Sequence, residues 1–109
     1  MATKQSTVDF LLDQLSALGD MSARKMFGEY ALYYTGKVVA FVCDDNLYIK
    51  PTTAGRQFIK DLQEAPAYPG SKLYFLISTD YWDDKEWLAE LITRTAAELP
   101  LPKPKKKKN

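Results

Sequence analysis

Apolar residues recur along this chain at two different spacings. In three segments they recur every three or four positions, which is the spacing of one buried face of a helix. This pattern predicts an N-terminal helix at residues 8–18, a middle helix at residues 54–63 and a C-terminal helix ending near residue 98. Short polar side chains before each segment provide candidate N-caps. They are Thr7 for the first helix, Thr52 or Thr53 for the second, and Asp80 or Asp83 for the third.

Between the first two helices the pattern changes to short runs rich in β-branched and aromatic residues. These runs cover residues 30–34, 38–43 and 47–50, and the turn sequences Thr35-Gly36 and Asp44-Asp45-Asn46 separate them. They predict a meander of three antiparallel strands. Residues 72–78 alternate as a later strand, and we expect both of its faces to be covered. The predicted fold class is therefore α+β, an antiparallel sheet of about three strands plus a later one, packed with the three helices.

The chain has 109 residues, which is enough for one domain. We expect residues 1–99 to form that domain and residues 100–109 to be a disordered tail rich in proline and lysine. Five of the 15 basic residues lie in this tail, so residues 1–102 carry 10 basic against 14 acidic residues, a net charge of −4. The tail is interpreted either as a solubiliser or as a weak, nonspecific contact to nucleic acid with a salt slope of about −4.5. The lysines concerned are Lys103, Lys105, Lys106, Lys107 and Lys108.

The composition excludes several classes of function. The chain has no histidine and one cysteine, Cys43, so histidine-based catalysis, a thiolate zinc site and an internal disulfide are all ruled out. We expect Cys43 to be a buried structural thiol, no cofactor to be bound and the protein to be cytoplasmic. No apolar run approaches the roughly 20 residues of a membrane-spanning helix, so no membrane association is expected. The acidic clusters at residues 44–45 and 80–86 are those expected of a turn and of a helix start, not of a catalytic pair.

Several short stretches together carry a family resemblance. They are Arg24-Lys25-Met26-Phe27-Gly28-Glu29-Tyr30, Leu32-Tyr33, Gly36, Asp44-Asp45 and Leu47-Tyr48-Ile49-Lys50. On these residues the chain resembles the N-terminal domain of the TfoX/Sxy family over nearly all of residues 8–99. The resemblance implies a regulator of natural competence or of a related transcriptional programme, without catalytic activity. Because the chain ends where longer members add a helical C-terminal domain, we expect a short, stand-alone member.

The first hypothesis for function is a small non-enzymatic regulatory or adaptor domain that binds a protein partner. Its candidate surface consists of the signature residues Arg24, Lys25, Met26, Phe27, Gly28, Tyr30, Tyr33, Tyr48 and Lys50. The signature has a structural interpretation as well, since Gly28 can bend the chain between strands and Leu47 and Ile49 can point into the core. The alternative function is a nonspecific nucleic-acid binder that works through the lysine tail. A homodimer formed through a sheet edge or the last helix is a further hypothesis.

Overall fold

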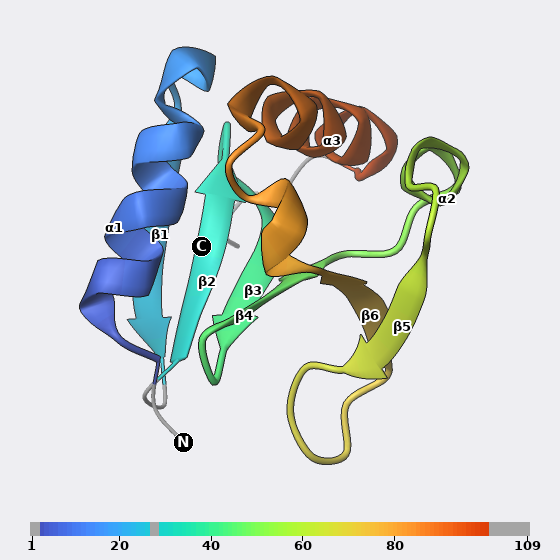
Figure 1. Ribbon diagram of the computed structural model, residues 1–109, viewed down its shortest axis with the longest axis horizontal. Helices are drawn as coiled ribbons and strands as arrows, with labels where there is room; N and C mark the ends of the chain where they lie inside the picture. Colours follow the sequence, from blue (N-terminus) through green and yellow to red (C-terminus); the bar gives the residue numbers. More distant parts are fainter. Residues whose placement is uncertain (1–2, 27–28, 101–109) are drawn as a thin grey trace, which may run out of the picture.

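The structure is a computed structural model and describes residues 3–26 and 29–100. Within these residues, three helices and two short 3₁₀ helices pack with one sheet (Figure 1). The helical elements are α1 (Gln5–Gln14), η1 (Ser16–Leu18), α2 (Thr53–Phe58), η2 (Thr79–Tyr81) and α3 (Lys85–Glu98). The strands are β1 (Met21–Met26), β2 (Glu29–Tyr34), β3 (Lys37–Cys43), β4 (Asn46–Ile49), β5 (Gln63–Pro66) and β6 (Leu73–Ile77).

The sheet has six strands in the order β1-β2-β3-β4-β6-β5, and every neighbouring pair is antiparallel. The α+β class and the antiparallel meander of β2, β3 and β4 are confirmed. The predicted number of strands was too small, because β1 and β5 were not recognised. Both are edge strands of the described sheet. β1 is mostly exposed, and β5 reads Gln-Glu-Ala-Pro, a polar run with a proline that tolerates only an edge position.

The helices differ from their predicted bounds for local reasons. α1 begins at Gln5, three residues early, and the hydroxyl of Thr7 does not cap it but donates to Asp45 Oδ1 at 2.8 Å. α2 ends at Phe58, and the predicted last residue, Gln63, belongs instead to β5. Thr52 caps α2 as predicted, accepting the Gly55 amide proton at 2.9 Å. The cap of α3 is neither predicted aspartate but Asp84, which accepts the Trp87 amide proton at 3.0 Å.

One face of the sheet holds the main hydrophobic core. Alternate strand residues such as Leu32, Ile49 and Phe75 point to this face and are fully buried. They pack against Leu15, the residue after α1, and against the apolar stripes of α1 and α3, which supply Val8, Leu11, Leu88, Leu91 and Ile92. In Figure 1, α1 runs alongside β1 and β2, while α3 and α2 lie above the other end of the sheet. We refer to this side as the helix face.

Two polar contacts fix the end of α3 against the rest of the domain. Lys37, at the start of β3, donates from Nζ to the carbonyl oxygens of Ala96 at 2.7 Å and Leu99 at 3.1 Å. Glu98 accepts the amide protons of Thr53 at 3.0 Å and Ala54 at 2.8 Å, which are free donors at the start of α2. The end of one helix therefore caps the beginning of another.

Acid should weaken this contact, because Glu98 must be ionised to accept both protons. Backbone hydrogen bonds from Ala54 and Thr53 hold the pKa of Glu98 below its ordinary value of 4.5. A carboxyl group whose pKa is lower in the folded chain stabilises the fold above its unfolded pKa, and that contribution is lost as the pH falls through the folded pKa. We therefore expect the urea midpoint to fall as the pH drops below 4.5. The fall should be smaller in Glu98→Gln, which starts from a lower midpoint at pH 7.

The control is Glu90→Gln, which removes one charge from the exposed side of the same helix. Its urea midpoint at pH 7 should stay close to that of the parent, because the ion pair that Glu90 forms with Arg94 in the described structure is exposed and such pairs contribute little. A Glu98→Gln chain that loses as much stability as the parent between neutral and acid pH would contradict the assignment.

Within residues 3–26 and 29–100, no helix is both long and apolar enough to cross a membrane.

Candidate functional site

The second face of the sheet carries apolar side chains that no helix of the described residues covers. The strand registers place Arg24 and Met26 of β1, Tyr33 of β2, and Phe41 and Cys43 of β3 on this side. Further along the sheet it continues with Tyr48, Tyr74 and Leu76. We call this side the open face.

A loop covers only part of the open face. It connects β5 to β6, and in Figure 1 it projects at the lower right, away from the helices. Its first residue, Ala67, is buried against Cys43, Tyr48 and Tyr74. The hydroxyl of Ser71 accepts the Ala67 amide proton at 3.0 Å, which holds the loop in a compact turn. The loop thus covers the β4 and β6 part of the face and leaves the part over β1 and β3 uncovered.

A groove of about 530 Å³ lies between this loop and the uncovered strands. Its walls come from β1, β2, β3 and the loop, and are formed by Met26, Glu29, Tyr30, Phe41, Cys43, Tyr68 and Pro69. Two of the four large hydrophobic side chains that the described structure exposes belong to it, Met26 at 39% and Tyr68 at 51%. We call this feature the open-face groove. Exposed apolar side chains gathered in a concave surface are typical of a binding site.

The open-face groove is acidic at the end where β3 runs into β4. Burial, and after it the carboxylates of Glu29 and Asp44, together raise the pKa of the Cys43 thiol from 9.0 to about 11. The opposite end of the open face is basic. There burial lowers the pKa of Lys50, at the end of β4, and the neighbouring Lys72 lowers it too. The charge of the side chains near the open face therefore changes from negative to positive between the two ends of β3 and β4.

The signature aspartates shape this acidic end. Asp44 and Asp45 both have positive φ, at 53° and 61°, which is the conformation of a type I′ hairpin turn. Non-glycine residues are strained there, so the turn needs outside support. Glu29 accepts the Asp44 amide proton at 3.0 Å, and Asp45 accepts the amide proton of Lys4 at 2.9 Å. The predicted turn is confirmed, and the two aspartates are explained by structure.

The structure separates the predicted partner surface into two sides of the sheet. Arg24, with its guanidinium 6.0 Å from the ring of Tyr33, lies on the open face together with Met26. Tyr48 is also on the open face but is buried beneath the loop. Lys25 and Tyr30 point to the helix side, and the hydroxyl of Tyr30 donates to Gln5 of α1 at 2.8 Å. Phe27, Gly28 and the tail lysines lie outside the described residues.

The groove also contains residues that the sequence did not identify as a site. Phe41 belongs to the predicted strand at residues 38–43, and Tyr68 and Pro69 lie between the predicted middle helix and the predicted strand at residues 72–78. Nothing in a strand pattern says which face a helix will cover, so Phe41 carried no signal. Cys43 is buried, as predicted, at 4% exposure.

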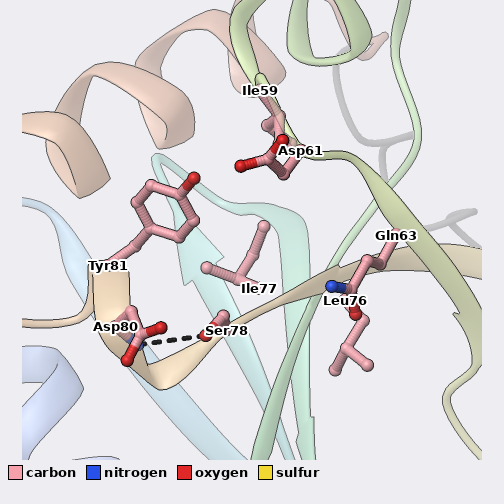
Figure 2. Close-up of a pocket in the computed structure, with 8 residues that line it drawn as sticks. All are labelled: Ile59, Asp61, Gln63, Leu76, Ile77, Ser78, Asp80 and Tyr81. Atoms are coloured by element: carbon pink, nitrogen blue, oxygen red, sulfur yellow. Dashed lines mark hydrogen bonds between the residues drawn. The ribbon is translucent and has the colours of Figure 1, made fainter.

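A second, more polar pocket of about 310 Å³ lies between η2 and the segment before β5 (Figure 2). Asp61 and Asp80 approach it from opposite sides, with the ring of Tyr81 between them. Both aspartates are exposed, and the amide of Asp80 donates to Ser78 Oγ at 3.2 Å, a turn that starts η2. In the described part of the chain, no three His, Cys, Asp or Glu side chains gather to hold a metal ion. The local turn accounts for the polar side chains on the η2 side of this pocket.

An aromatic stack lies beside this pocket. Trp87 of α3 stacks on Tyr81 at 4.4 Å and on Phe58 of α2 at 5.4 Å, with Arg94 over the outer side of Phe58 at 4.9 Å. The stack joins α2 to α3. A shallow pocket of about 650 Å³ lies against it, lined by Gln57, Phe58, Lys60, Tyr81, Trp87 and Arg94.

These features define a small α+β domain in which the described helices cover one side of an antiparallel sheet and the other side carries an apolar groove. The family model of the TfoX N-terminal domain matches residues 13–99, and the chain belongs to this family. It is also similar to a protein of Spirochaeta aurantia described as an uncharacterized 12.7 kDa protein in the trpE 5' region. The two are 42% identical over 108 residues, which covers 99% of this chain and 93% of the relative. The resemblance seen in the signature stretches is confirmed.

Proposed function

We propose that this chain is a small regulatory adaptor domain that binds a protein partner through its open face and performs no chemistry itself. Membership in the TfoX N-terminal domain family, which is linked to competence regulation, supports a regulatory role. The observation that carries the proposal is the open-face groove, with Met26 and Tyr68 exposed beside Phe41. The groove floor favours binding over catalysis, since its one nucleophile, Cys43, is kept as a thiol at neutral pH.

The exposed apolar residues provide matched variants for a test. Met26 and Tyr68 are exposed at 39% and 51% on the groove, whereas Phe10 and Leu73 are exposed at 39% and 52% elsewhere. We expect Met26→Ser combined with Tyr68→Ser to lower recovery of a specific partner at least fivefold in quantitative affinity purification from the native host. The control pair, Phe10→Ser with Leu73→Ser, should leave that recovery unchanged.

Urea unfolding of both variants must accompany the capture experiment, so that a loss of folded protein is not read as a loss of binding. Arg24→Ala and Lys25→Ala test which face of the sheet binds the partner, because these adjacent residues lie on opposite faces of β1. Only the Arg24 change should weaken capture. Equal losses from the groove pair and the control pair would refute binding through the open face.

The alternative, nonspecific nucleic-acid binding through the lysine tail, predicts a different outcome. Fluorescence anisotropy with duplex DNA would then show binding that weakens with salt at a slope of about −4.5 and does not respond to Met26→Ser or Tyr68→Ser. Binding of that kind without any groove-dependent protein partner would favour the alternative.

A further inference from the structure

We propose that the open face is a docking surface for a basic, proline-rich peptide segment, and that the segment that occupies it is the chain's own residues 100–108. The sequence Pro-Leu-Pro-Lys-Pro-Lys-Lys-Lys-Lys combines alternating prolines with a run of lysines. Alternating prolines favour an extended polyproline II conformation, and aromatic grooves bind such segments at low entropic cost. The docking itself does not depend on the proposed function.

The charges of the two partners are complementary. Residues 1–102 carry a net charge of −4, and the five tail lysines carry +5. At the groove the acidic charges are Glu29 on its wall and Asp44 at the adjacent turn, both close enough to raise the pKa of Cys43. Arg24 of β1 is the basic side chain on the same face, beside Tyr33. Lysine stems can lie on Phe41 and Tyr68 while their ammonium groups approach these carboxylates.

The prolines and lysines of the segment occur in the same order as the apolar and acidic parts of the open face that they would contact. The segment leaves the domain beside Lys37, because the Leu99 carbonyl oxygen accepts a proton from Lys37 Nζ at 3.1 Å. This end of the sheet is the basic one, near Lys50 and Lys72. A segment that runs along β3 from there places its prolines first, beside the half-buried Tyr33 and Val38, and its lysines last, at the acidic end.

The length of the segment is sufficient for docking within one molecule. The path along β3 from residue 37 to residue 44 is about 23 Å at the usual strand rise. Residues 100–108 span about 28 Å as polyproline II. The difference, together with the reach of the lysine side chains, lets the segment pass around the end of the sheet. If the groove also binds a protein partner, as proposed above, the tail competes with that partner.

A spin label at the end of the tail tests the proposal in the full chain. The variant Asn109→Cys, in a Cys43→Ser background, carries one nitroxide, and amide signal intensities are compared before and after its reduction. We expect at least fivefold loss of signal at Glu29, Phe41 and Tyr68, and little loss at Asp13 of α1 or Glu90 of α3. The loss should shrink when salt is raised, because exposed charges are then screened.

Two controls make each outcome decisive. Changing Lys105, Lys106, Lys107 and Lys108 to serine keeps the tether but removes the charges, and should restore the groove signals to within twofold of their reduced values. Losses that persist in that variant would overturn the proposal.

A mixture of isotope-labelled chain without nitroxide and unlabelled chain with nitroxide reports docking between molecules. Signal loss only in that mixture would overturn docking within one molecule. Because no partner is present, a negative result here leaves the capture experiment unaffected.

Discussion

Replacing Phe75 with alanine is expected to lower the free energy of unfolding by about 3–5 kcal/mol, the usual cost of deleting a buried aromatic side chain. Phe75 is fully buried in β6, and its backbone pairs with Ile49 of β4 and Glu64 of β5. Its ring also lies under the guanidinium of Arg56 in α2, 5.2 Å from the ring centre. Phe75 therefore connects to the two neighbouring strands through its backbone and to the middle helix through its ring.

The packing around Phe75 leaves little room for the structure to relax. A Cβ atom added at Gly55 of α2 would come within 3.3 Å of the Phe75 ring, so helix and ring are already in close contact. The cavity left by alanine would thus persist, and persistent cavities give the larger losses. A loss of this size should lower the melting temperature by roughly 15 °C or more.

Leu73→Ala provides the control, because Leu73 lies two residues away in the same strand and is 52% exposed. Its effect should stay within about 0.5 kcal/mol, as for most surface substitutions. Thermal and urea unfolding, followed by circular dichroism, measure both. A Phe75→Ala chain as stable as the Leu73→Ala chain would mean that the core is not organised around β6.

The elements that the sequence predicted correctly are those whose own residues carry the signal. β3 and β4 are rich in valine, isoleucine and aromatic residues, and their turns contain the glycine and aspartates that positive φ favours. β1 and β5 form because a neighbouring strand offers its free backbone groups, and Met21–Met26 has no such signal of its own. α2 was predicted too long for a related reason. Ile59 is buried in the core in an extended conformation, and its apolar side chain was taken as part of the helical stripe.

The candidate site was predictable only in part. The signature directed attention to Arg24, Met26 and Tyr33, and these do share the open face. The same signature contains Tyr30, whose hydroxyl donates to Gln5 of α1, and Asp45, whose carboxylate accepts the amide proton of Lys4, the residue before α1. A sequence motif combines residues that stabilise the fold with residues that remain available for binding. Successive strand residues alternate between the two faces of the sheet, but which face is buried is known only from the register and the helix positions.

The chemistry of Cys43 provides the other large expected effect. Its pKa is raised from 9.0 to about 11, first by burial and then by Glu29 and Asp44. At a pH below both values, this shift lowers the thiolate fraction about 100-fold, and the thiolate is the reactive form. We therefore expect iodoacetamide at pH 8 to modify the folded protein at least about 100-fold more slowly than the chain unfolded in urea.

The pH dependence of that reaction distinguishes a shifted pKa from simple shielding. If Glu29, Asp44 and burial suppress ionisation, the rate for the folded protein should keep rising past pH 9 toward pH 11, whereas the rate for the unfolded chain levels off near its ordinary value of 9.0. Circular dichroism at each pH confirms that the protein is still folded. A rate that levels off near pH 9 in both states would show that the thiol is shielded but not shifted. It would also weaken the electrostatic support for an acidic groove that attracts lysines, because Glu29 and Asp44 contribute to the shift after burial.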